Sequence, residues 1–450
     1  MNTPMPTLSP CRLRLTAAAA ALLIACAAPA SATTIERVVS PGGIVAWLVR
    51  ESAVPMIAVD FAFVGGAIQD PAGKAGTASL TAALLDEGAG DLDSKAYHDR
   101  LERNAIELSF QAERDTVRGS LRTLTEHRDE AFDDLRLALT APRFDTDEVE
   151  INRAQILSLV RRASTSPTEI ANQRWWETAF AGHPYGRPVD GTLETVPTIT
   201  RDDLVSYARR VLARDNLKIA VVGDIDAETL KPLLDRVFGA LPAKADLAPV
   251  GAASPQGLGR RIVIKLDVPQ AVVTFGGPGI ARKDPDFMAA YIVNHVLGGG
   301  SLSSRLYQEV REKRGLAYSV YDNLMWLNHT ALFIGATATR ADRTGETLEL
   351  IEQEIHRLAQ SGPTADELIK AKAYLNGSFP LNLDTSGKIA AMLVQLQLDD
   401  LDIDYFERRP QMINAVTLED ARRVAKRLLD GGLLVTVAGR PEGLASNSAN

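Results

Sequence analysis

The stretch Leu297–Asp322, LGGGSLSSRLYQEVREKRGLAYSVYD, carries the most informative local pattern in this chain of 450 residues. Its three consecutive glycines predict a turn, because glycine has no Cβ and accepts backbone conformations that other residues avoid. Leu302, Leu306 and Val310 follow at a spacing of four, and this spacing predicts a helix with one buried apolar stripe.

The end of this stretch predicts a corner between a helix and a strand. Gly315 is suited to a left-handed stop, so the helix should end at Arg314. The residues from Leu316 to Tyr321 alternate as a strand does. Arg311 and Tyr318 therefore flank the corner, where a guanidinium and a phenol can donate to one oxygen. In the alternative interpretation, Arg311 is a solvated helix end and Tyr318 a core aromatic.

One arrangement of strands and helices occurs twice in the chain. Three pairs of landmarks recur: Val54-Pro55 as Val268-Pro269, Thr200/Asp203 as Thr417/Asp420, and Gly223 as Gly439, at offsets of 214 (268 − 54), 217 (420 − 203) and 216 (439 − 223). A nearly constant offset indicates an internal duplication. The sequence therefore predicts an α+β protein made of two tandem homologous units.

The domain boundaries follow from this repeat. Residues 33–240 form the first predicted unit and residues 260–442 the second. The linker between them is residues 241–259, which are rich in Ala, Pro and Gly and show no periodicity. Residues 443–450 are a tail.

The N-terminal residues are typical of an export signal. An apolar run at 15–28 follows two arginines and precedes the small-residue site Ala30-Ser31-Ala32. Residues 1–32 are therefore expected to be a signal peptide, with a periplasmic or secreted product. The sequence ending at Cys26 also resembles a lipoprotein signal, and in that alternative the protein is anchored to a membrane through Cys26.

Composition excludes several classes of protein. The formal net charge is −8, and the chain has no sustained basic run, which argues against a nucleic-acid partner. The two cysteines, Cys11 and Cys26, both lie in the leader. The rest of the chain therefore has no disulfide, thiol nucleophile or cysteine metal ligand.

The run SRLYQEVREKRGLAYSV, residues 304–320, resembles the C-terminal-half signature of the pitrilysin/insulinase family of zinc peptidases. The similarity extends over nearly the whole chain after the leader. It implies two halves that close like a clam shell around a peptide. It also implies that Arg311 and Tyr318 help to hold the substrate and the developing oxyanion.

The metal positions of the family are vacant in this sequence. Active members carry H-x-x-E-H on the first long helix of the N-terminal half and a further Glu on a later helix. Alignment of the helix expected at Gly76–Leu85 puts Ser79, Ala82 and Ala83 at the His, Glu and His positions. Leu159 falls at the later Glu position. Alanine and leucine cannot bind a metal, and a lone serine is a poor zinc ligand, so no metal is expected in this chain.

The other candidate sites are weaker. The six histidines are scattered, and His98 with Glu102 supplies two ligands where a catalytic zinc needs three. No G-x-S-x-G elbow occurs. Trp175-Trp176 is placed between helical segments, and core packing is favoured there over a ligand platform.

These observations favour a non-catalytic subunit of an exported heterodimeric zinc metallopeptidase. Arg311 and Tyr318 would act in trans on a peptide substrate, and the zinc would be held by a partner subunit of the same family. The alternative is a structural or peptide-binding pseudoprotease without a catalytic role. A positioned Arg/Tyr pair discriminates between them, because a scaffold does not need it.

Overall fold

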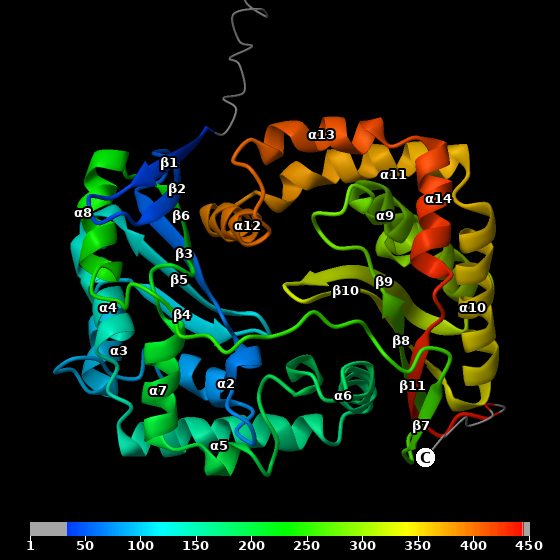
Figure 1. Ribbon diagram of the computed structural model, residues 1–450, viewed down its shortest axis with the longest axis horizontal. Helices are drawn as coiled ribbons and strands as arrows, with labels where there is room; N and C mark the ends of the chain where they lie inside the picture. The colour runs from blue at the N-terminus through cyan, green and yellow to red at the C-terminus, as the bar shows by residue number, and fades with distance from the viewer. Residues whose placement is uncertain (1–33, 443, 445–450) are drawn as a thin grey trace, which may run out of the picture.

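The computed structural model describes residues 34–442 and 444. The predicted leader, with Cys26, and most of the predicted tail lie outside the described residues. Within them the chain is α+β, with one mixed sheet in each half and helices packed around both (Figure 1). The fold class predicted from the sequence is thus confirmed. No helix in this part of the chain is both long and apolar enough to cross a membrane.

The N-terminal lobe is built on a six-stranded sheet in the order β1-β2-β6-β3-β5-β4. Its β2–β6 pair is parallel, and the other pairs are antiparallel. Its strands are β1 (Ile35–Val39), β2 (Val45–Arg50), β3 (Met56–Val64), β4 (Glu107–Ala112), β5 (Thr116–Leu124) and β6 (Leu217–Gly223). Its helices are α2 (Thr77–Ala82), α3 (Ser94–Arg103), α4 (Arg128–Thr140), α5 (Thr146–Ala163), α6 (Pro167–Ala179), α7 (Arg201–Val211) and α8 (Ala227–Phe238).

The C-terminal lobe repeats this plan with a five-stranded sheet in the order β7-β11-β8-β10-β9. Its β11–β7 pair is parallel, and the remaining pairs are antiparallel. Its strands are β7 (Arg261–Lys265), β8 (Gln270–Pro278), β9 (Ala317–Leu327), β10 (Thr330–Arg340) and β11 (Leu434–Gly439). Its helices are α9 (Phe287–Asn294), α10 (Thr344–Ser361), α11 (Ala365–Ser378), α12 (Ser386–Leu398), α13 (Tyr405–Ala415) and α14 (Leu418–Leu429).

Matching close contacts in the two sheets support the duplication. In the N-terminal sheet, the ring of Phe61 lies over Gly119, where an added Cβ would come within 2.2 Å of it. Phe275 and Gly335 form the same contact in the C-terminal sheet, at 2.4 Å. The predicted caps also recur, because Thr200 and Thr417 each form a capping box with the aspartate three residues on.

One helix from each lobe packs on the sheet of the other lobe. Helix α6 packs on β8 and β11, whereas α12 packs on β3 and β6, and both lie between the sheets in Figure 1. Hydrogen bonds cross with them: Trp175 Nε1 donates to the Leu434 carbonyl at 3.0 Å, and Gln397 Nε2 donates to the Ile219 carbonyl at 2.9 Å. The exchange holds the two lobes in one arrangement, since moving either would expose an apolar sheet face.

The helix predicted from Leu302 to Arg314 is corrected by the structure. Residues Ser301–Ser303 form a 3₁₀ turn, and the π-helix η7 covers Tyr307–Glu312. The backbone of Ser304 is extended, with ψ of 153°, so no helix can run through it. Leu302 is consequently 63% exposed, whereas Leu306 and Val310 are buried as expected.

The prediction for the tryptophan pair was right about packing and wrong about position. Trp175 and Trp176 lie inside α6, with exposed fractions of 0% and 5%. With Phe180 and Tyr185 they form a separate apolar cluster at the junction of the lobes.

Candidate functional site

The corner between η7 and β9 brings Arg311 and Tyr318 together. Gly315 has φ of +59°, the left-handed conformation predicted for it, and its N–H donates to the Arg311 carbonyl at 2.9 Å. The Arg311 Cζ atom lies 4.3 Å from the ring centroid of Tyr318 and 4.9 Å from that of Tyr307. The guanidinium is thus held by two aromatic rings.

A β-bulge turns Tyr318 toward solvent. Ala317 pairs with Thr339 and Val320 with Thr337, so Tyr318 and Ser319 both face one residue of β10. Ala317 and Val320 are buried, and Tyr318 is 81% exposed. The alternative in which Tyr318 is a core aromatic is therefore wrong.

The polar groups of this pair are not used inside the chain. Among the described residues, neither the Arg311 guanidinium nor the Tyr318 hydroxyl forms a hydrogen bond or an ion pair. The nearby Glu309 instead accepts from Lys313 at 2.6 Å and from Arg314 at 2.7 Å, and these bonds hold its pKa below the usual range. Arg311 thus keeps its donors free although a carboxylate lies two residues away.

The helical segment is anchored to the rest of the lobe by an ion pair. Arg305 donates to both carboxylate oxygens of Glu367, at 2.7 and 2.8 Å, at the start of α11. Burial alone would raise the pKa of Glu367, but the hydrogen bonds from Arg305 and Thr364 lower it to about 2. Such a bidentate pair fixes geometry as well as charge.

The glycine loop before this segment rests on a buried acid that the sequence interpretation missed. Asp322 on β9 is fully buried, and Asn294 Nδ2 donates to its Oδ2 atom. Burial raises the pKa of this carboxyl well above its usual value, although the bond from Asn294 acts in the opposite direction. The only signal available in the sequence was the alternation of the strand, which puts Asp322 on the same face as the buried Val320 and Leu324.

The residues predicted at the family's metal positions belong to two helices that pack together: Ser79 and Ala82 lie in α2, Ala83 is its C-terminal cap, and Leu159 lies in α5. The Ser79 hydroxyl donates to Asp190 Oδ1 at 2.7 Å, and Ala82 is only 1% exposed. Leu159 is 47% exposed on the neighbouring helix. A hydroxyl, two methyl groups and an isobutyl group do not fit zinc. In the part of the chain that is described, no three His, Cys, Asp or Glu side chains are grouped to hold a metal.

Two cavities meet beside these positions. One of about 840 Å³ lies between α5, α6 and residues 186–194 and is lined by Leu159. The other, of about 730 Å³, lies between the lobes and is lined by Trp326 and Asp399. Both are lined by Arg114 and Trp176, so this pair forms the boundary between them.

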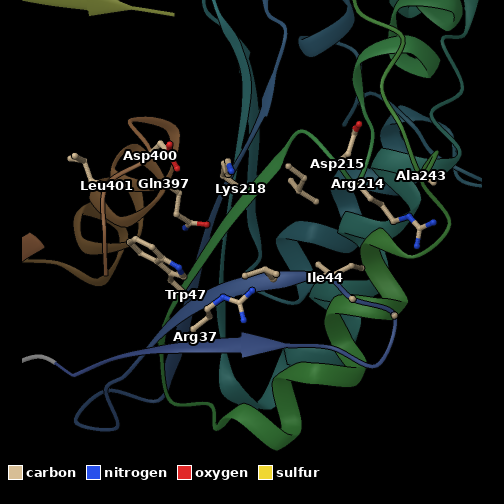
Figure 2. Close-up of a pocket in the computed structure, with 14 residues that line it drawn as sticks. Arg37, Ile44, Trp47, Arg214, Asp215, Lys218, Ala243, Gln397, Asp400 and Leu401 are labelled. Carbon is tan, nitrogen blue, oxygen red and sulfur yellow. The ribbon is translucent and has the colours of Figure 1, made fainter. Parts of the chain in front are cut away.

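A third cavity, of about 520 Å³, follows the seam between β1, β2 and the end of α12. Figure 2 shows that its basic side chains come from separate elements and do not converge, with Arg214 pointing toward Ala243 and away from Arg37. None of the candidate residues from the sequence lines it. We assign no chemistry to this cavity.

Two family models match the chain in succession. "Insulinase (Peptidase family M16)" covers residues 49–193, and "Peptidase M16 inactive domain" covers residues 198–375. Together they span most of both lobes.

Relatives named as proteases and as a non-peptidase both match. An uncharacterized zinc protease of Streptomyces coelicolor is 30% identical over 88% of this chain and 87% of its own. A protein of Helicobacter pylori named non-peptidase homolog YmxG is 29% identical over 74% of this chain and 77% of its own. A probable mitochondrial-processing peptidase subunit beta of Schizosaccharomyces pombe is 26% identical over 88% of each chain.

Solved structures share the fold. A peptidase M16 inactive domain from Pseudomonas fluorescens superposes with a TM-score of 0.85 at 27% identity, over 92% of this chain and 99% of that one. A protease from Helicobacter pylori gives a TM-score of 0.82 at 21% identity, over 90% of this chain and all of its own, which supports the fold alone.

Proposed function

Because this chain belongs to the M16 (insulinase) family of peptidases, we propose that it is the non-catalytic, Arg/Tyr-bearing subunit of a heterodimeric zinc metallopeptidase. Its partner is a zinc-bearing subunit of the same family, and its substrate is a peptide. The complex works outside the cytoplasm, in the periplasm or secreted, or attached to a membrane through Cys26 if the leader is lipidated.

One contrast carries the proposal. The donors of Arg311 and Tyr318 are unpaired among the described residues and held in place by the Gly315 turn and the bulge in β9. The residues that we predict at the metal positions of the other lobe, Ser79, Ala82, Ala83 and Leu159, offer no zinc ligand set, and Ala82 is closed off by packing. A protein without any function does not need two exposed hydrogen-bond donors held in a fixed position.

In the complex, Arg311 and Tyr318 donate to the substrate carbonyl oxygen as it gains negative charge. Preorganised donors of this kind stabilise the transition state more than the ground state. Zinc on the partner supplies Lewis-acid activation of water. The guanidinium keeps its orientation because it contacts the rings of both Tyr307 and Tyr318.

Reconstitution tests this proposal. The chain and a zinc-bearing M16 protein from the same organism are purified separately and then mixed with a quenched fluorescent peptide. The mixture is expected to cleave the peptide, and neither protein alone should match its rate. Sedimentation velocity on the same samples should show a complex, because a closed bilobal pair buries more than roughly 1,000 Å². Two separate species and no gain in rate would contradict the proposal.

The second candidate is a structural or peptide-binding pseudoprotease. The non-peptidase name of one relative favours it, because that relative also spans most of this chain. Under this alternative, the mixture forms a complex but its cleavage rate does not depend on Arg311 or Tyr318.

A further inference from the structure

The boundary between the two adjoining cavities is a cation stacked on an aromatic ring. The Arg114 Cζ atom lies 3.8 Å from the ring centroid of Trp176. Trp176 is itself fixed, since its ring stacks on Phe180 with centroids 5.3 Å apart. The position of the guanidinium is therefore determined by a rigid aromatic support.

Arg114 has unused donors. Its Nη1 atom donates to the carbonyls of Tyr185 and Arg187, at 3.0 and 3.1 Å. No bond from its Nε or Nη2 atom to another described residue is seen, and it forms no salt bridge with them. Its neighbour Asp115 is occupied, accepting from the Tyr185 hydroxyl and from the backbone N–H of Asn328.

A second arginine, Arg187, also lines the larger cavity. Arg187 donates to the carbonyls of Asp70 and Ile68, at 3.0 and 3.2 Å. Its buried Nε atom has no hydrogen-bond partner in the described part of the chain. Burial lowers the pKa of Arg114 to about 10, although Asp115 acts in the opposite direction, so its charge is poorly compensated.

The acidic side chains that line the larger cavity do not compensate the charge of Arg114. Glu169, Asp190 and Glu194 line the cavity and are exposed to solvent. Glu177 is paired instead, with Arg174 at 3.4 Å and with Gln173 at 2.8 Å. None of these four carboxylates forms a salt bridge with Arg114 in the described part of the chain.

We propose that Arg114, held against the ring of Trp176, binds the carboxylate of a peptide, from its C-terminus or from an acidic side chain, in the cavity between α5, α6 and residues 186–194. A guanidinium fork matches the two oxygens of a carboxylate. The cavity is of the size that binds extended small ligands, and Leu159, Val160 and Leu193 offer apolar contacts along it. This site goes beyond the proposed function, because it lies in the N-terminal lobe rather than at the corner of Arg311 and Tyr318 and requires no partner.

Calorimetric titration of the protein alone tests the site. The probes are a tetrapeptide, acetyl-Ala-Gly-Ala-Leu, with a free carboxylate, the same peptide as its C-terminal amide, and an amidated peptide ending in Glu. The free acid or the Glu peptide is expected to bind at least about tenfold more tightly than the plain amide, because hydrogen bonds to charged groups are strong. Comparison of the two carboxylate probes identifies which source the site prefers.

Two variants test whether Arg114 causes the preference for a carboxylate. Arg114→Gln should abolish the preference for the carboxylate, whereas Arg162→Gln, at an exposed position of the same cavity, should leave it unchanged. Thermal melts check that both variants fold. If Arg114→Gln does not fold, the comparison of acid and amide on the unmodified protein still tests the proposal. Equal affinity for acid and amide, a preference that survives Arg114→Gln, or equally tight binding of inorganic phosphate would overturn the proposal.

Discussion

The backbone of Gly298 lies directly against the carboxyl group of Asp322, where an added Cβ would be 2.0 Å from Oδ1. Gly298 belongs to the π-helix η5 (His295–Gly299), and Asp322 lies on β9, four residues beyond Tyr318. The contact joins the glycine loop to the strand that carries the tyrosine. No larger residue fits at this position.

Gly298→Ala is therefore expected to destabilise the protein by about 1–3 kcal/mol, the usual cost of overpacking a buried contact. The matched control is Gly377→Ala in α11, where an added Cβ meets nothing within 4 Å. That change should stabilise the helix by about 0.5–1 kcal/mol. Urea unfolding of both variants measures the difference, and equal free energies of unfolding would show that the loop yields easily.

Asp322→Asn should stabilise the protein increasingly as pH rises. Burial raises the pKa of Asp322 in the folded protein. Below the ordinary pKa of an aspartate, the folded and unfolded chains are both protonated, so Asp322 does not lower the free energy of unfolding there. Above that pH the unfolded chain ionises freely and the folded chain cannot, so the free energy of unfolding falls. Melting temperatures at pH 4 and pH 8 should diverge between wild type and variant, with the exposed Asp91→Asn as control. A constant difference would mean that Asp322 is ionised in the fold.

The purified protein should contain no stoichiometric zinc. Ser79, the two alanines and Leu159 offer no ligand set, and Ala82 is too buried for a glutamate to replace it without rearrangement. Metal analysis after dialysis against zinc-containing buffer measures this directly. A content near one zinc per chain would contradict the alignment of α2 with the family's metal-binding helix.

The sequence predicted the parts of the fold that depend on local patterns. The capping boxes at Thr200 and Thr417 and the left-handed Gly315 needed no knowledge of tertiary structure. The repeat offset predicted the two lobes in the same way. The exchange of α6 and α12 between lobes could not be predicted, because either sheet offers an apolar face and periodicity does not say which one a helix covers.

The candidate site, too, could be predicted from the sequence only in part. A spacing of seven placed Arg311 and Tyr318 near each other, but the bulge that exposes Tyr318 depends on the pairing of β9 with β10. Leu302 was expected in the core because the helical period extends to it, and the extended Ser304 breaks that period. Asp322 and Arg114 were missed because their roles come from residues distant in the sequence.

Arg311→Lys should reduce cleavage by the reconstituted complex without preventing assembly. Lysine keeps the charge over the Tyr318 ring but loses the planar fork that donates two parallel bonds. The rate constant kcat with saturating peptide is expected to fall, while sedimentation shows the same complex. Wild-type kcat in the lysine variant would mean that charge alone is required there.

The most direct test of the split-site mechanism is kcat for Tyr318→Phe in the assembled complex. The substitution removes a hydroxyl from a side chain that is 81% exposed, so folding and assembly should not change. Loss of one preorganised oxyanion donor predicts a fall in kcat of about 10²–10³. Tyr321→Phe, on the same strand and 47% exposed, is the matched control and should cleave at the wild-type rate. If Tyr318→Phe assembles normally and also cleaves at the wild-type rate, the tyrosine does not act on the substrate and the mechanism is wrong.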